Sequence, residues 1–215
     1  MALGVPTVAS SVQEAQRRRR DKEETRARVV DAARTLFSRE GFERVTIRMI
    51  AEEAGVATGS VFITFTSKDE LCDEIMCEYA VALAARLDAD AQRTRGAPVA
   101  ERLSALIAAA LDAPPERLTF IREAVAAAWT RNEAAERKLR QACAGIWDAV
   151  GGVFQDALAA KELPVDFDVR SGCEVVAMVG LAAFRHGVYE PSPPEAMRER
   201  VRRQLDLLIK GWAGC

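Results

Sequence analysis

The segment from Thr46 to Leu71 constrains the fold of this chain more than any other stretch of its sequence. Thr46 is a residue type that caps helix starts, and Gly55 allows the positive φ with which many helices end. A second short helix fits residues 58–65, and Ser67-Lys68-Asp69-Glu70 is a capping-box pattern for a third. Two short helices joined by a tight glycine turn make a helix-turn-helix, whose second helix enters the DNA major groove.

In and before this segment, a set of residues matches the spacing of a known sequence signature without gaps. Its members are Val29-Val30, Ala32-Ala33, Leu36-Phe37, Gly41-Phe42, Thr46, Ile50-Ala51, Ala54-Gly55-Val56, Gly59-Ser60-Val61-Phe62, Phe65, Ser67-Lys68 and Leu71. Over about residues 25–75 this pattern resembles the N-terminal signature of the TetR family of bacterial transcriptional regulators. The remainder of the chain is similar to that family only in length and helical character.

The resemblance implies a DNA-contacting role for several residues. Arg48 would reach a base edge, because a guanidinium can donate two hydrogen bonds to guanine. Thr46 would lie near a phosphate, and Ser60 and Lys68 would bind phosphate. The remaining members of the expected DNA-binding set, along the second helix, are Thr58, Gly59, Phe62, Ile63 and Thr64.

Three residues depart from the family pattern. Ala57 stands where a capping Ser is usual, and losing such a cap costs about 0.5–2 kcal/mol unless Thr58 caps instead. Phe62 replaces the usual Tyr and loses its hydroxyl, while Thr64 replaces Tyr or His and has a shorter reach. Phe62 and Phe65 also fit core positions, an interpretation that we accept for Phe65. Weaker DNA binding is expected, or binding that depends on a basic arm.

The sequence predicts an all-α protein in three parts. Residues 1–20 lack apolar periodicity and end in four arginines, so they are predicted to be a disordered basic arm, either DNA-contacting or a solvated tail. Residues 21–66 would form the helix-turn-helix domain, with its first helix starting near Asp21 or Thr25. Residues 67–215 would form a helical ligand-binding and dimerisation domain. Residues 1–68 hold 12 Lys and Arg against 9 Asp and Glu, which suits a DNA-contacting head.

Helices are predicted in this third part from Ser67 to about residue 93, over 100–111, up to about 130, from Asn132 to about 161, over 168–187, and over about 195–212. The 168–187 helix contains Val175–Phe184, which is apolar nearly all round and is therefore predicted to be buried on several sides. The final helix places its apolar residues on one stripe, which could pack onto its own chain. The resemblance instead favours a four-helix bundle with a second subunit. The residues expected at that interface are Val176, Val179, Ala183, Val201, Leu205, Leu208 and Trp212.

A small, largely apolar effector is also implied by the resemblance. The middle helices carry large aromatic residues among many alanines, a mixture that could leave a cavity with a few orienting polar groups. For each aromatic residue, an ordinary core position is the preferred interpretation. The candidate lining residues are Phe120, Arg122, Trp129, Trp147, Phe154, Met178, Phe184 and His186.

No enzyme pattern appears in the sequence. The single histidine, His186, excludes an HExxH zinc site, and the nucleophile-elbow, dinucleotide and P-loop motifs are missing. The five cysteines have no metal-binding spacing, so no cofactor or metal is expected. The longest uncharged apolar run, Val175–Phe184, is too short to span a bilayer, and the first residues lack signal-peptide features. A cytoplasmic protein without a membrane partner is expected.

The expected function is that of a ligand-responsive transcriptional regulator. As a homodimer it would bind a pseudo-palindromic double-stranded operator, most often as a repressor that a small molecule releases. The alternative is a helical protein-interaction module without sequence-specific DNA binding.

Overall fold

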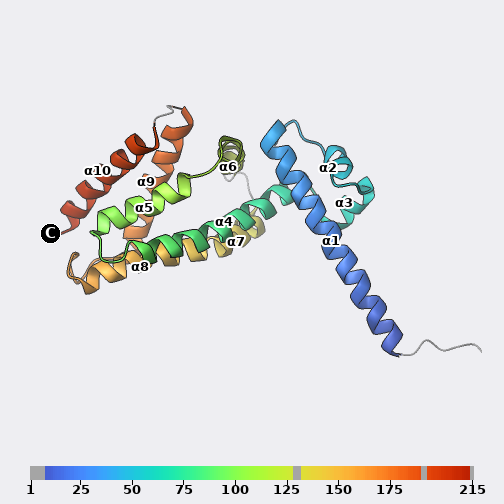
Figure 1. The fold of residues 1–215 in the computed structure, drawn as a ribbon, viewed down its shortest axis with the longest axis horizontal. Coiled ribbons are helices and arrows are strands. Elements are labelled where there is room, and N and C mark those ends of the chain that lie inside the picture. The colour runs from blue at the N-terminus through green and yellow to red at the C-terminus, as the bar shows by residue number, and fades with distance from the viewer. Residues whose placement is uncertain (1–7, 128–131, 190–192, 214–215) are drawn as a thin grey trace, which may run out of the picture. The chain divides into compact units, whose positions relative to one another are not determined.

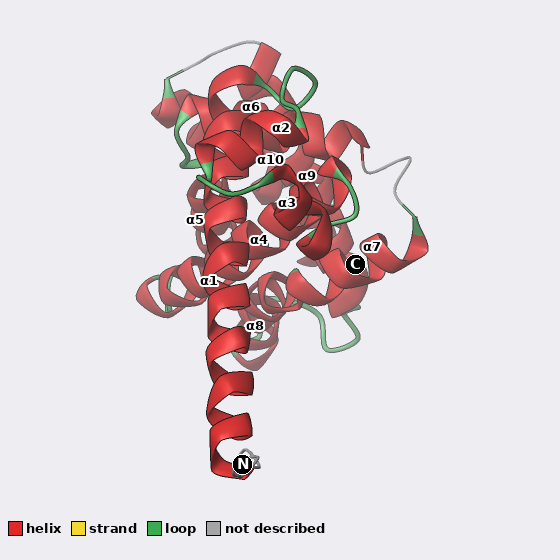
Figure 2. Ribbon diagram, turned by 90° about the vertical axis from the view of Figure 1, so that its right-hand side faces the viewer, coloured by secondary structure: helices red, strands yellow, loops and turns green. Residues whose placement is uncertain are grey.

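The computed structural model describes residues 8–127, 132–189 and 193–213, which form helices joined by loops, with no strand in these ranges (Figure 2). The all-α class is therefore confirmed. The chain divides into two compact units, Met1–Ile75 and Met76–Cys215, here called the head and the body. The boundary lies inside helix α4 (Lys68–Arg93) rather than before it, since Leu71 and Ile75 of its first two turns are fully buried.

The head is built from α1 (Val8–Glu40), α2 (Ile47–Glu53), α3 (Thr58–Thr64) and the start of α4. The inward stripe of α1 consists of Val29, Ala33 and Phe37, one turn apart, and all three are fully buried. Helix α1 packs on both α2 and α3, which also pack on each other. Burial of each large apolar side chain contributes about 1.5–3 kcal/mol, so this stripe anchors the two short helices.

Helix α1 begins at Val8, so the prediction of a disordered arm is wrong for residues 8–20. Ion pairs one turn apart line this segment: Arg18–Glu14 at 2.7 Å, and Arg19–Glu23 and Arg20–Glu24 at 2.9 Å. Each pair contributes only about 0.2–0.5 kcal/mol. Extending an existing helix is nevertheless far easier than nucleating a new one. A polar segment can therefore prolong a helix whose other residues are anchored in the core.

The body is organised around α5 (Val99–Leu111), which packs against α8 (Ala144–Ala159), α9 (Val169–Tyr189) and α10 (Pro194–Ala213) (Figure 1). One hydrophobic core joins these helices. Leu103 of α5, Val153 of α8 and Leu205 of α10 are fully buried in it. The rings of Phe154, Phe167 and Trp212 pack together at one side, with centroids 5.1–6.1 Å apart.

The remaining body helices are α6 (Pro115–Ala127) and α7 (Glu133–Ala142). Asn132 caps α7 as predicted, since its side chain accepts from the Ala135 N–H at 3.0 Å. The single long helix predicted from Asn132 is interrupted at Cys143, and α8 begins at Ala144. A Cβ at Gly145 would lie only 2.9 Å from the Cβ of Ala84, so α8 and α4 approach very closely just after this break.

Candidate nucleic-acid interface and body cavities

The turn between α2 and α3 is fixed from both ends. The Thr46 hydroxyl accepts from the Met49 N–H at 3.3 Å, which confirms the predicted cap of α2. Gly55 has a φ of +62°, a conformation that side-chain-bearing residues rarely adopt. Arg28 of α1 donates to the Ala54 carbonyl at 2.6 and 3.1 Å and to the Gly55 carbonyl at 2.8 Å. No local sequence pattern indicates this role of Arg28, because its partners lie 26 and 27 residues away.

Helix α3 divides cleanly into a buried and an exposed face. Val61 and the adjoining Phe65 are buried, which confirms the core position of Phe65. Phe62 and Ile63 point outward with 55% and 76% of their surface exposed, so Phe62 is not a core residue. Two large apolar side chains on a short solvent-facing helix indicate a surface that meets another molecule.

The start of α3 lacks the side-chain cap that is usual at a helix N-terminus. Ala57 occupies the N-cap position, and Thr58 is the first helical residue, so Thr58 does not replace the missing cap. Gly59 follows on the exposed side, and a Cβ there would meet nothing within 4 Å. Neither space nor a positive φ requires glycine at this position. The Thr64 hydroxyl donates to the Ser60 carbonyl at 3.3 Å, which holds Thr64 against its own helix.

Arg48 and Lys68, two predicted cationic contacts, differ in their surroundings. Arg48 is exposed, and no residue in the described part of the chain gives it a hydrogen bond or an ion pair. Lys68 Nζ donates to the carbonyl of Phe42 at 2.7 Å and to that of Glu43 at 3.4 Å, and it lies 4.2 Å from the centroid of the Phe42 ring. Lys68 therefore holds the loop before α2, an arrangement that the sequence pattern did not reveal.

Helix α4 starts with a variant of the predicted capping box. The Ser67 hydroxyl accepts from the Glu70 N–H at 3.1 Å, as expected. The Glu70 carboxylate, however, accepts from the N–H and the hydroxyl of Thr66, at 2.6 and 2.7 Å, rather than returning to Ser67. The loop between α3 and α4 is thereby tied to the first turn of α4.

Comparison with known proteins agrees with this geometry. Residues 29–75 match the family model described as "Bacterial regulatory proteins, tetR family". The helix-turn-helix within residues 29–75 of this chain is that of the TetR family. The chain is 36% identical over 55 residues to the HTH-type transcriptional regulator YfiR of Bacillus subtilis, covering 26% of this chain and 27% of YfiR. It is 41% identical over 51 residues to the HTH-type transcriptional repressor KstR2 of Rhodococcus jostii, covering 24% and 25%. The match thus spans about a quarter of each relative's length.

Solved structures extend the similarity of fold to most of the chain. The Bacillus subtilis transcriptional regulator FadR in complex with stearoyl-CoA has a TM-score of 0.69 at 17% identity, covering 83% of this chain and 96% of FadR. Salmonella enterica GusR has a TM-score of 0.66 at 21% identity, covering 89% and 96%. At this identity the likeness shows a shared fold and leaves the ligand open.

Four of the seven residues expected at the dimer interface face the interior of the body instead. Val201 and Leu205 are buried, and both belong to the core in which α10 packs on α5. Val176 and Ala183 are also buried, and Val179 and Trp212 pack against the same core, while Leu208 is half-buried. The prediction is therefore corrected for Val176, Ala183, Val201 and Leu205, whereas it stays a prediction for the three half-buried residues. An apolar stripe shows that one face is buried, but the stripe alone cannot show against which chain.

A different apolar face is open on the same two helices. Met178, Leu181 and Tyr189 of α9 are 68%, 49% and 70% exposed, and Leu207 of α10 is 73% exposed. The prediction that Val175–Phe184 is buried on several sides is thus wrong for its outer face. The exposed side chains follow helical spacing along α9, with Ala182 and Arg185 between them.

The predicted effector residues do not surround one cavity. Phe120 and Phe154 are fully buried core residues, and Phe120 packs edge-on against Tyr79 with centroids 5.9 Å apart. Met178 and Trp147 are exposed, and Arg122 lies on the surface with Glu123 at 3.8 Å. Trp129 lies outside the described residues. Phe184 lines one of the two cavities described below, and His186 lines the other.

The first cavity, the inner cavity, lies between α5, α6, α9 and α10 and has a volume of about 410 Å³. Its walls are mostly apolar, with Ile107, Leu111 and Leu118 on one side and Phe184 and Met197 on the other. Ser104, Asp112 and Arg198 add a few polar groups. A half-open, mostly apolar space of this size with sparse polar groups fits a small, largely apolar ligand.

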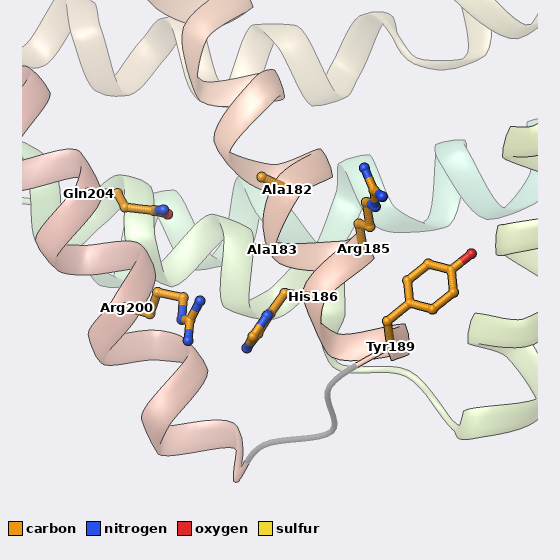
Figure 3. A pocket seen from close by; sticks show the side chains of 7 residues that line it. All are labelled: Ala182, Ala183, Arg185, His186, Tyr189, Arg200 and Gln204. Carbon is orange, nitrogen blue, oxygen red and sulfur yellow. The ribbon is translucent and has the colours of Figure 1, made fainter.

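The second cavity, the outer pocket, lies between α9 and α10 and measures about 420 Å³ (Figure 3). It is lined by Ala182, Ala183, Arg185, His186, Tyr189, Arg200 and Gln204. Its lining holds a larger share of polar side chains than that of the inner cavity, including two arginines. Ala183 lines both cavities, so one alanine side chain takes part in both walls.

The cysteines and acidic groups show no metal cluster within the described ranges of the chain. Burial raises the pKa of the Cys143 and Cys173 thiols, which disfavours the reactive thiolate. None of the helices searched in those ranges is both long and apolar enough to cross a bilayer.

Proposed function

We propose that this chain is a ligand-responsive transcriptional regulator that binds double-stranded DNA as a homodimer and acts most simply as a repressor. The observation that carries the proposal is the outer face of α3, where Phe62 and Ile63 are exposed beside a glycine that the fold itself does not require. Such a face suits close contact with the edges of bases in a major groove. A regulator of this kind would act in the cytoplasm.

Each part of the head would contribute a different type of DNA contact. Arg48, which has no partner in the described chain, would read a base edge, while Thr46 and Ser60 would lie near phosphates. Phe62 and Ile63 would meet thymine methyl groups, and Gly59 would allow the backbone to come close. Thr58 would complete the groove face. Thr64 would add little, because its hydroxyl is already bonded to its own helix.

Lys68 would act chiefly by holding the loop before α2. Two of the three ammonium N–H groups are directed to the carbonyls of Phe42 and Glu43, which leaves one for a phosphate. Its contribution to DNA affinity would therefore be partly indirect, through the position of α2.

The homodimer would form through the outer face of α9 and α10, marked by Met178, Leu181 and Leu207. Exposed large apolar residues grouped on two adjacent helices are typical of a surface that a partner covers. Two-fold symmetry would then present two copies of α3 to half-sites about 34–36 Å apart, or a multiple of that distance.

The effector would occupy the inner cavity. Its apolar walls and few polar groups suit a small apolar molecule, and the FadR structure of similar fold holds stearoyl-CoA. A ligand that binds one body conformation better than another would shift the population toward it, and operator DNA would in turn weaken ligand binding by the same factor.

The test is selection of bound duplexes from a random pool, followed by measurement of affinity against salt concentration. We expect a pseudo-palindromic sequence and an affinity that falls steeply as salt rises, because phosphate contacts release counterions. Equal affinity for all duplexes at physiological salt would contradict the proposal. Failure to retain any duplex would favour a protein-interaction module.

A further inference from the structure

Two arginines and a histidine line the outer pocket, and none of its described lining residues is a carboxylate. Figure 3 shows Arg200 of α10 and His186 of α9 pointing toward one another across the gap between the helices, with Arg185 and Tyr189 on the same end of α9. The Arg185 guanidinium lies 6.0 Å from the centroid of the Tyr189 ring. Gln204 adds an amide on the α10 side. Donor groups therefore dominate this pocket.

Arg185 and Arg200 of the outer pocket differ from several other arginines of the body in their charged neighbours. Two other arginines on the same helices carry carboxylate partners: Arg202 bonds Glu199 and Asp206 at 2.9 Å, and Arg170 lies 3.5 Å from Glu174. Arg198 of α10, like the pocket arginines, has no ion pair among the described residues. No residue in the described ranges forms an ion pair with Arg185 or Arg200. The pocket thus holds two cations whose countercharge is not supplied by the described chain.

We propose that the outer pocket binds a small organic phosphate. Arginine donates several hydrogen bonds in a fixed plane that matches phosphate oxygens, and two arginines suit a dianion better than a single carboxylate. The volume of about 420 Å³ exceeds that of a lone ion and falls in the range of small-molecule sites. Ala182 and Ala183 offer an apolar wall for the organic part, and the Tyr189 hydroxyl and the Gln204 amide supply neutral hydrogen bonds.

The position of the pocket links this ligand to the homodimer, and this step rests on the proposed function. By helical spacing, Ala182 and Arg185 of the pocket lie on the same face of α9 as the exposed Met178 and Leu181, and Gln204 lies on the same face of α10 as the exposed Leu207. A second copy placed there would desolvate Arg185 and Arg200, which is costly unless a countercharge accompanies them. The exposed carboxylates of Glu174 and Glu199 are already paired within their own chain. A bound phosphate supplies the missing charge, so it strengthens the pairing of two copies.

The experiment titrates the full-length protein with phenyl phosphate by isothermal calorimetry, in phosphate-free buffer at constant ionic strength. Arg200→Gln removes one cation of the pocket, and Arg203→Gln is the matched control, because Arg203 lies on the same helix, 3.9 Å from Glu199, and does not line the pocket. Sedimentation equilibrium with and without phenyl phosphate measures the dimer. Benzoate, a monoanion with the same ring, tests the preference for a dianion.

Saturable binding of phenyl phosphate that Arg200→Gln weakens by about tenfold or more, and Arg203→Gln leaves unchanged, supports the site. The dimer should also tighten on addition of phenyl phosphate. Absence of saturable binding, equal losses in both variants, or equal affinity for benzoate would overturn the proposal. A chain that stays monomeric at all concentrations yet binds phenyl phosphate through Arg200 would refute the homodimer while supporting the phosphate site. Failure of the phosphate site and failure of the proposed homodimer are therefore distinguishable.

Discussion

Lys68 and Phe42 are joined twice, by a hydrogen bond of 2.7 Å from the ammonium to the Phe42 carbonyl and by the ammonium lying 4.2 Å from the ring centroid. Lys68→Ala should therefore destabilise the folded protein by about 1–3 kcal/mol as well as weaken DNA binding. Arg48→Ala, which removes a side chain without a partner in the described chain, should weaken DNA binding and leave the melting temperature unchanged. Thermal unfolding followed by circular dichroism separates the two variants. Identical melting temperatures would show that Lys68 has no structural role.

Gly59 allows stability and DNA contact to be separated. Gly59→Ala should raise the free energy of unfolding by about 0.4–1 kcal/mol, because a Cβ meets nothing within 4 Å and alanine favours a helix. It should nevertheless weaken operator binding, by roughly tenfold or more, if the backbone approaches the bases closely. Gly152→Ala in α8 is the matched control, since a Cβ there also meets nothing and the site is in the body. Unchanged operator affinity in Gly59→Ala would refute the close approach.

The polar extension of α1 should affect DNA binding without affecting the core. Deleting residues 2–20 should lower affinity and flatten its salt dependence, because it removes Arg17 to Arg20. The melting temperature should stay the same, since the described side chains of this segment are exposed. A gel-shift titration at several salt concentrations, together with thermal unfolding, checks both statements. Equal affinity at low salt would identify the extension as a solvated helix.

Neighbouring leucines of α10 should respond differently to the same change. Leu207→Asp should weaken the dimer while the far-ultraviolet spectrum stays intact, because Leu207 is 73% exposed in the single chain. Leu205→Asp should instead unfold the body, since Leu205 is fully buried and its loss alone would cost about 2–5 kcal/mol before the buried charge is counted. Sedimentation equilibrium on the folded variants decides between them. A Leu207→Asp dimer as tight as the parent would place the interface elsewhere.

Acid should weaken the body through Asp156. The hydrogen bond from Arg102, 2.6 Å long, together with the charges of Arg102 and Arg95, holds the pKa of Asp156 below its ordinary value. A lowered folded pKa means that the stabilisation is complete above the unfolded pKa of about 3.9 and is lost as pH falls through the folded value. Asp156→Asn should cost about 1–3 kcal/mol at pH 7, because Arg102 is buried and its Nε already lacks a partner in the described structure.

The melting temperature of the parent and of Asp156→Asn, measured from pH 7 down to about pH 2.5, tests this linkage. The difference between them should shrink below about pH 4, where the parent loses its own carboxylate. A difference that stays constant over the whole range would exclude a role for the charge of Asp156.

Features decided within a few residues could be predicted from the sequence. The caps at Thr46, Ser67 and Asn132 were all found in place, since each depends on a hydroxyl or amide next to the start of a helix. The exposed and buried faces of α3 were also anticipated from the family pattern. Long-range contacts were not: Arg28 and Lys68 bond to carbonyls 25 to 27 residues away, and no local pattern marks such partners.

The errors in the body have a common cause. Apolar periodicity shows that Val201 and Leu205 are buried but does not name the surface that buries them, and α5 of the same chain does so. Large aromatic residues were expected around a ligand, yet Phe120 and Phe154 fill the core, and the inner cavity is lined mostly by smaller aliphatic side chains. For residues 8–20 of α1, the lack of apolar periodicity led to a prediction of disorder. This segment is helical, and ion pairs rather than apolar contacts line it.

The absence of a side chain at Gly145 has a mechanical consequence. Because a single added carbon there would lie 2.9 Å from the Cβ of Ala84, no free space separates α8 from α4 at this point. Interiors packed this tightly transmit displacement rather than absorb it. Any side chain at position 145 would therefore have to push α8 away from α4, the helix whose first two turns complete the head core.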